Sequence, residues 1–168
     1  TVIIVGAIAA WSYSFFVAPE SVEAISEKWS RSGHADAESE SFVRWAGDDP
    51  PEMPVACAKC HSMDGYLDFV GADGSPAGSV DEPVLGVSVV SCRTCHNEQA
   101  HEMTEVTFPS DITVEERTSA ANCMQCHQGR RSTQDVEDAV AGLEADAVSD
   151  DVGFINVHYA IAAATLLG

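Results

Sequence analysis

The residues of this sequence that could do chemistry are its cysteines and histidines, six of each. All the cysteines fall in three copies of the pattern C-x-x-C-H, which begin at residues 57, 92 and 123. No cysteine is left over, so this spacing does not fit the disulfide framework that six cysteines in an exported chain usually indicate. Zinc ribbons pair C-x-x-C units about 15 to 20 residues apart without a histidine after each, so zinc does not fit either.

C-x-x-C-H is the attachment signature of haem c. The two thiols become thioethers at one edge of the porphyrin, and the histidine that follows binds the iron from one side. The sequence therefore predicts three covalently attached haem c groups. The attachment residues are Cys57 and Cys60 in the first motif, Cys92 and Cys95 in the second, and Cys123 and Cys126 in the third. The predicted proximal iron ligands are the motif histidines His61, His96 and His127.

Three histidines outside the motifs remain, namely His34, His101 and His158. Three irons need three further ligands if each is six-coordinate, so the count predicts these residues as the distal ligands. Taken singly, each also has an ordinary interpretation: a solvated loop residue for His34, a polar surface residue for His101, and a hydrogen-bonded core residue for His158. Because His101 follows its own motif closely, we expect it to bind the iron of a neighbouring haem.

Methionine is the alternative distal ligand, and it would raise the reduction potential. The chain has four methionines, Met53, Met63, Met103 and Met124. Two of these, Met63 and Met124, lie too close to their own motifs to bind the iron attached there. We therefore predict bis-histidine ligation at all three haems, which implies low potentials.

Two axial ligands on every iron leave little room for a substrate, so the sequence predicts electron transfer between closely spaced haems and no enzymatic activity. Two alternatives stay open. One is a subunit of a polymeric extracellular cytochrome filament, which would need haems exposed at both ends of the subunit. The other is a multihaem oxyanion reductase, which would need one open haem, and the histidine count argues against it.

The charge of the chain limits its partners. There are 27 Asp and Glu residues against 8 Lys and Arg residues, a formal net charge of −19. Such an acidic surface repels phosphate backbones, which excludes nucleic acid as a partner. The acidic residues are spread along the chain. This distribution fits either a solvated surface in a salty environment or a surface that docks a basic redox protein. The expected partners are redox donor and acceptor proteins or copies of this chain.

Residues 1–18 carry no charge and reach the lower limit of a membrane-spanning helix. Aromatic residues gather toward one end of this stretch, as they do at membrane interfaces. We predict an N-terminal hydrophobic helix over 1–18, acting as a membrane anchor or an assembly helix; a signal sequence is the alternative. Residues 19–168 are predicted to form a trihaem cytochrome c domain. Haem c is attached outside the cytoplasmic membrane, so we expect a membrane-anchored protein in the periplasm or outside the cell.

The elements that position the motifs are predicted to be short. Aromatic residues make up only 7% of the chain, so haems are expected to supply much of the core. The predicted fold class is mostly irregular with short α-helices packed around haem. Helices are predicted over 21–31, 41–46, 132–141 and 152–167, and from a capping box at 113–116 toward Cys123. Residues 64–91 are predicted to be mostly loop, with a short strand at 87–90.

Several segments resemble multihaem c-type cytochromes of respiratory and extracellular electron transfer. The stretch from Trp29 to Ala35, followed by the first motif, resembles their pattern of a Ser-Gly-His-Ala ligand upstream of the first haem. Residues 123–130 and 156–159 are similar to such proteins as well, and the likeness spans residues 29–168. The resemblance implies closely packed haems, and related chains often carry more than three.

Overall fold

The computed structural model describes residues 20–116 and 118–167. The helices are α1 (Val22–Ser30), α2 (Glu40–Val43), α3 (Val55–His61), α4 (Met63–Phe69), α5 (Cys92–Cys95), α6 (Glu98–Glu102), α7 (Ala120–His127), α8 (Thr133–Ala139) and α9 (Ala162–Leu167). The strands are β1 (Glu52–Met53), β2 (Val84–Leu85), β3 (Glu105–Thr107) and β4 (Thr113–Glu115). Long irregular segments join these elements, as the predicted fold class requires.

The predicted hydrophobic helix over residues 1–18 lies outside the described residues. Within residues 20–116 and 118–167, no helix is long and apolar enough to cross a membrane.

The strands form two small antiparallel sheets. In one, β1 pairs with β2, with Met53 opposite Val84. In the other, β3 pairs with β4, with Val106 opposite Val114. The first sheet joins segments far apart in the sequence, whereas the second is a hairpin whose strand β3 packs against α7.

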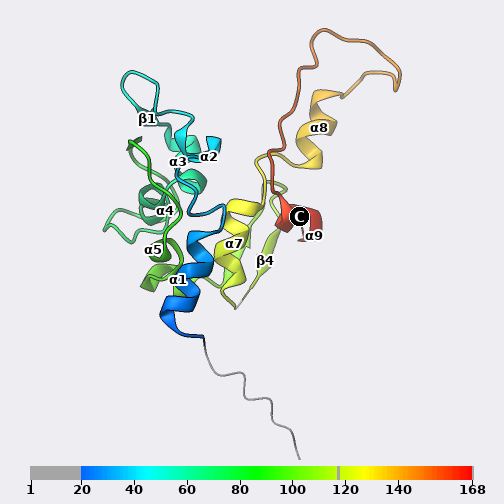
Figure 1. The fold of residues 1–168 in the computed structure, drawn as a ribbon. Coiled ribbons are helices and arrows are strands. Elements are labelled where there is room, and N and C mark those ends of the chain that lie inside the picture. Colours follow the sequence, from blue (N-terminus) through cyan, green and yellow to red (C-terminus); the bar gives the residue numbers. More distant parts are fainter. Residues whose placement is uncertain (1–19, 117, 168) are drawn as a thin grey trace, which may run out of the picture.

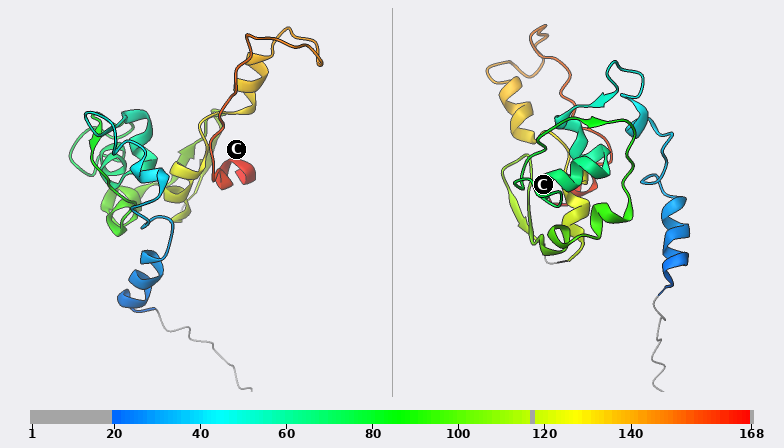
Figure 2. Two further views of the ribbon diagram at one scale, coloured as in Figure 1. Left: turned by 45° about the horizontal axis from the view of Figure 1, so that its top comes forward. Right: turned by 90° about the vertical axis from the view of Figure 1, so that its left-hand side faces the viewer.

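The motif helices lie in the centre of the molecule, and two segments extend away from it. Figure 1 shows α3, α4 and α5 on one side and α7, β4 and α9 on the other. Helix α1 and the arm formed by α8 and the chain after it both project from this body in Figures 1 and 2. Accordingly, neither α1 nor α8 contains a buried residue.

The apolar core is small and divided. One cluster joins β3, α7 and α9, and its buried members are Val106, Phe108, Ala121, Met124 and Ala163. Other buried side chains lie around α3 and α4, including Met53, Tyr66, Leu67 and Val70. Several large apolar side chains are exposed, among them Val148 at 98% and Phe154 at 90%.

Several predicted elements are confirmed. Helix α1 lies within the predicted 21–31, and Ser21 caps it by accepting a hydrogen bond from the Ala24 N–H. Helix α2 begins one residue before the predicted 41–46, but it ends early, at Val43. Helix α8 begins where predicted, because the Ser132 and Asp135 side chains form a reciprocal capping box.

Other predicted elements are wrong. The Thr113 capping pattern starts no helix, because residues 113–115 pair with β3 as strand β4, and the helix before Cys123 begins only at Ala120. Residues 64–91 are mostly irregular, as predicted, although α4 runs to Phe69; the predicted strand at 87–90 is wrong, because the strand lies at 84–85. The last helix covers only Ala162–Leu167, because the chain before it is held in an irregular path beside α7.

Helices α3 and α4 pack closely at Gly65. A Cβ atom at this position would lie 2.5 Å from the backbone carbon and oxygen of Ala58, a separation that real contacts do not show. Only glycine allows the chain that follows the first motif to turn back onto α3 at this distance.

Gly65→Ala should therefore destabilise the loaded protein by about 1–3 kcal/mol, because overpacking against backbone outweighs the helix propensity gained. Urea unfolding measures the change. Gly47→Ala is the matched control, since nothing lies within 4 Å of a Cβ there, and it should change the free energy of unfolding by less than about 0.5 kcal/mol. Equal stability of the two variants would contradict this account of α3–α4 packing.

Candidate haem attachment sites and axial histidines

Each C-x-x-C-H motif lies on a short helix. The first is in α3, the second in and just after α5, and the third in α7. A helix places residues three apart on the same face, so the two cysteines of each motif present their sulfurs side by side. All six cysteines are free thiols, and Cys92, Cys95 and Cys123 are exposed. These thiols are the groups that would form the thioether bonds to a porphyrin.

Local capping ends the first motif helix at its histidine. The buried Ser62 follows His61, and both its N–H and its hydroxyl donate to the Ala58 carbonyl, at 3.1 and 2.9 Å. The same hydroxyl oxygen accepts the Gly65 N–H at 2.9 Å and so caps α4. This arrangement places His61 at a helix end, where its ring is free to face another segment.

The six histidines lie in three pairs, and each pair joins one motif histidine to one distal histidine. The rings of His61 and His158 have centroids 5.6 Å apart, with Nε2 atoms 3.4 Å apart. The rings of His96 and His101 lie 5.9 Å apart, and those of His34 and His127 lie 6.2 Å apart. The structure thus brings every predicted ligand next to one partner.

Backbone carbonyls hold two of the motif histidines. The Nδ1 atom of His61 lies 2.8 Å from the Ser41 carbonyl oxygen, and that of His127 lies 2.6 Å from the Ala160 carbonyl oxygen. A carbonyl can only accept, so Nδ1 carries the proton and Nε2 is left with a free lone pair. This second-shell hydrogen bond is the usual way in which a metal-binding imidazole is oriented.

The residues fit a haem iron between paired imidazoles. An imidazole nitrogen lies about 2 Å from a bound first-row metal, so two nitrogens on opposite sides of one ion lie about 4 Å apart. The Nε2 separation of His61 and His158 is 3.4 Å, which needs only a small opening. In addition, the buried Nδ1 of His158 has no hydrogen-bond partner, so Nε2, which faces His61, is the ring atom through which His158 contacts another side chain.

The surroundings of the His61–His158 pair favour the neutral form of both rings, which is the form that binds a metal. Burial lowers the pKa of His61, although the hydrogen bond to the Ser41 carbonyl opposes this shift. Burial also lowers the pKa of His158, and the nearby Arg130 charge lowers the pKa of both rings. Both effects disfavour the imidazolium, which could not bind iron.

The segment that carries His158 is held tightly against the end of α7. The φ angle of His158 is +82°, in the left-handed region that non-glycine residues rarely adopt. The Asn156 side-chain oxygen accepts the His158 N–H at 2.9 Å, and the Val157 carbonyl accepts the Arg130 N–H at 3.3 Å. A Cβ at Gly129 would lie 3.0 Å from the same Val157 oxygen. Strain of this kind persists where the surroundings impose it, often at functional sites.

The placement of His101 corrects one expectation. We expected it to serve a neighbouring haem, yet its ring lies beside His96 of its own motif. The chain turns back at Asn97, whose side chain accepts the Ala100 N–H at 2.8 Å and donates to the Arg93 carbonyl at 2.9 Å. Helix α6 starts there, and it returns His101 toward the motif that it follows.

The methionine side chains are used in packing. Met53 is 1% exposed, and Met124 belongs to the cluster around β3, α7 and α9. The Met63 sulfur accepts the Ser91 hydroxyl at 2.8 Å, and the Met103 sulfur accepts the Gln125 amide at 3.6 Å. These contacts favour histidine over methionine as the distal ligand.

Sequence reasoning missed a buried hydrogen-bond chain between the three motif regions. The Tyr66 hydroxyl of α4 donates to the Asn122 side-chain oxygen at 2.7 Å, and the Asn122 amide donates to the Ala100 carbonyl at 2.9 Å. It also missed the carbonyls of Ser41 and Ala160 that orient motif histidines. Every residue has a backbone carbonyl, so the residue types at positions 41 and 160 could not indicate this role. For the hydrogen-bond chain, the signal in the sequence was Tyr66, a tyrosine soon after the first motif.

Comparison with known proteins finds a family to which part of the chain is similar. Residues 79–144, which contain the second and third motifs, match the family described as cytochrome c7 and related cytochrome c. No curated protein and no solved structure matches the chain. Residues 79–144 are thus similar to a cytochrome c7-like multihaem cytochrome domain, which confirms the resemblance to multihaem c-type cytochromes. Proteins of this family are typically electron carriers with haem c, and c-type cytochromes lie outside the cytoplasm.

Proposed function

We propose that this chain carries three haem c groups, each closed by two histidines, and passes electrons between them. The observation that carries the proposal is the arrangement of all six histidines in three pairs of one motif and one distal residue. The first haem would be held by His61 and His158, the second by His96 and His101, and the third by His127 and His34.

The residues of the chain have distinct tasks in this function. A bound haem iron supplies a one-electron ferric–ferrous couple. The cysteines would hold each porphyrin on its motif helix, and the histidine pairs would bind the iron and so leave no room there for water or substrate. The Ser41 and Ala160 carbonyls keep the Nδ1 protons of His61 and His127 in place, so Nε2 stays available to the iron. This arrangement supports electron transfer and gives a substrate no open coordination site.

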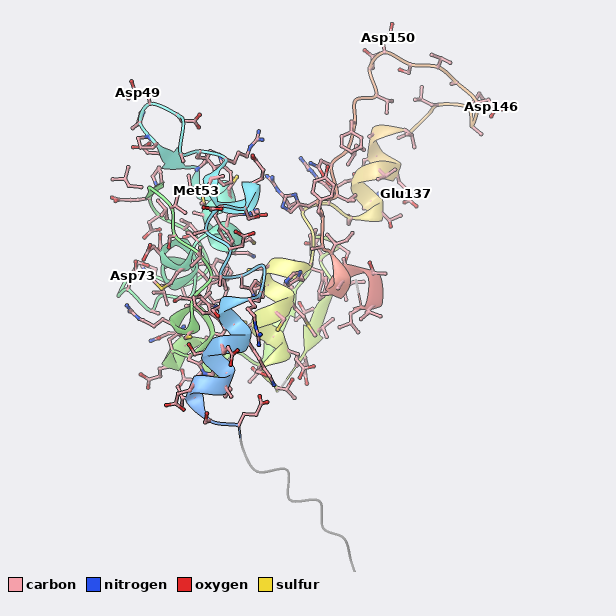
Figure 3. All side chains as sticks on the ribbon, viewed as in Figure 1. Asp49, Met53, Asp73, Glu137, Asp146 and Asp150 are labelled. Carbon is pink, nitrogen blue, oxygen red and sulfur yellow. The ribbon has the colours of Figure 1, made fainter. Side chains whose placement is uncertain are left out.

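The external partners and the membrane attachment stay predictions. Acidic side chains lie far apart on the molecule: Figure 3 labels Asp49 and Asp73 on one side and Glu137, Asp146 and Asp150 on the projecting arm. This spread suits both a solvated acidic surface and contacts with basic redox proteins. Assembly of copies into a filament is likewise an open alternative.

Replacement of a distal histidine should leave one coordination position vacant on one haem iron. In His34→Ala, His101→Ala and His158→Ala, we expect one haem of the three to show a ferric high-spin signal and to bind carbon monoxide when reduced. Electron paramagnetic resonance (EPR) and optical spectroscopy measure both. Met103→Leu is the control and should stay fully low-spin, because its sulfur accepts from Gln125. A histidine variant that stays fully low-spin, or a control variant that shows a high-spin signal, would argue against the assigned ligands.

Arg130 should raise the potential of the haem at the first motif. Its charge lies near the His61–His158 pair, and a positive charge disfavours the ferric state. We expect Arg130→Gln to lower one of the midpoint potentials by tens of millivolts, an order-of-magnitude estimate from screened charges several ångströms apart. Spectroelectrochemical titration measures the shift.

The adjacent arginine provides the control for this prediction. Arg131 pairs with Asp135, its Nη1 atom lying 3.0 Å from the carboxylate oxygen, so its charge is already balanced. Arg131→Gln should therefore leave all three potentials nearly unchanged. An equal shift in both variants, or an upward shift in Arg130→Gln, would contradict a specific effect of Arg130 on the first site.

A further inference from the structure

The distal histidine of the third pair, His34, lies on a segment that is weakly joined to the rest of the protein. Residues 20–38 consist of α1 and the turns around it, and α1 has no buried residue. Helix α1 stands apart from the body in the right-hand view of Figure 2. The one hydrogen bond from this segment to a distant part of the described chain runs from the Trp29 indole N–H to the Val90 carbonyl, at 2.9 Å. The next buried side chain along the chain is Phe42.

The backbone around His34 makes short-range bonds. The Ser32 N–H and hydroxyl both donate to the Trp29 carbonyl, at 2.9 and 2.6 Å, and the Ala35 N–H donates to the Ser32 carbonyl at 3.1 Å. A Cβ at Gly33 would meet nothing within 4 Å. Among the described residues, the bond of Trp29 is therefore the one hydrogen bond to the body that resists a movement of this segment.

The other two distal histidines have firmer surroundings. His101 follows the buried Ala100, whose carbonyl accepts the Asn122 amide at 2.9 Å. His158 lies in the positive-φ segment that is bonded to the end of α7. Detaching either ring from an iron would require a buried or constrained part of the structure to move. Segments with few buried contacts open at the lowest free energy, so His34 is the distal ligand that leaves most readily.

The motif histidine of the same pair is fixed. The Nδ1 atom of His127 lies 2.6 Å from the Ala160 carbonyl oxygen, and helix α7, which carries His127, contributes Ala121 and Met124 to the apolar core. The rings of His34 and His127 are also the most widely separated of the three pairs, at 6.2 Å. An iron bound at the third motif would thus keep its proximal ligand and its thioether attachment when His34 leaves.

We propose that His34 is an exchangeable ligand, so that the third haem in its ferrous state binds a small neutral molecule in place of this histidine. The inference rests on the proposed function, in which all three irons have two histidine ligands at rest. In the exchange, the bond between the iron and a nitrogen of His34 breaks, and a bond between the iron and the incoming molecule forms. The iron stays ferrous, no electron is transferred, and the imidazole leaves in its neutral form.

The charge around His34 selects the class of ligand. Three acidic residues, Asp36, Glu38 and Glu40, follow it closely in the sequence, and the whole chain has a formal net charge of −19. Such a field repels anions, so nitrite and other oxyanions are disfavoured at this position. Ferrous haem binds neutral diatomic molecules that accept electron density from the iron. Carbon monoxide is the probe of this class.

Carbon monoxide binding to the reduced, intact protein tests the inference. We expect one haem of the three to bind it slowly, at a rate that stops rising with carbon monoxide concentration once dissociation of His34 limits the reaction. Trp29→Phe removes the donor to Val90 and should raise this rate about two- to tenfold, as expected for the net loss of one hydrogen bond.

Ser30→Ala is the matched control on the same helix. The Ser30 hydroxyl donates to the Glu27 carbonyl within α1 and so does not join the helix to the body. This variant should leave the rate of carbon monoxide binding unchanged. Equal rates in Trp29→Phe and Ser30→Ala would count against the inference.

The distal-histidine variants show which haem reacts slowly. In His101→Ala and His158→Ala, we expect the slow phase in addition to the immediate reaction of the one haem that each variant opens. In His34→Ala, we expect the immediate reaction alone, because the slow haem is then the one already open. A slow phase that persists in His34→Ala would overturn the inference, and so would an unmodified protein that binds no carbon monoxide.

Measurements on the unmodified protein distinguish the two levels of failure. Fewer than three haems by mass spectrometry, or a high-spin ferric EPR signal, would contradict the proposed function itself. Three low-spin haems without carbon monoxide binding would leave the proposed function standing and overturn only the exchange of His34. If the variants fail to fold, hydrogen exchange of the unmodified protein still decides. The amides of residues 21–38 should exchange faster than those of α6 and of residues 156–160, and equal protection would overturn the inference.

Discussion

A histidine can bind an iron only through a nitrogen that carries no proton and faces the metal. In this protein the Ser41 and Ala160 carbonyls meet that requirement by accepting hydrogen bonds from the Nδ1–H groups of His61 and His127, which leaves Nε2 without a proton. These contacts also explain why irregular chain surrounds the motif helices. A carbonyl in the middle of a long helix is committed to the helix, whereas the last four carbonyls of a helix and those of a bent segment are available to an imidazole. Ser41 is in the four-residue helix α2 and Ala160 is in an irregular segment, so both carbonyls are available.

The segment from Asn156 to Ala160 adopts unusual backbone angles in order to place a histidine and a carbonyl beside the motifs. His158 and Ala160 both have positive φ angles, at 82° and 53°, and a helix could not contain them. Gly129 makes room for the segment beside α7, where only glycine tolerates both the φ angle of 80° and the close Val157 oxygen. The chain thereby presents one histidine to the first motif and one carbonyl to the third from a single short stretch.

The candidate sites could be predicted from sequence far better than the elements that carry them. The C-x-x-C-H motifs are local patterns with one chemical meaning, and the three further histidines followed by counting. The pairing could not be predicted, because it depends on distant contacts such as His34 with His127. His101 was placed wrongly because sequence separation alone did not show the turn at Asn97. The capping pattern at Thr113 failed because strand pairing with β3 outweighed a local helix signal.

The central claim is that three haems are attached and that two histidines close each of them. One combined measurement tests it: haem content by mass spectrometry together with the EPR spectrum of the same oxidised sample. The account predicts three haems per chain and only low-spin ferric signals. Fewer than three haems, or a high-spin signal from the unmodified protein, would contradict it.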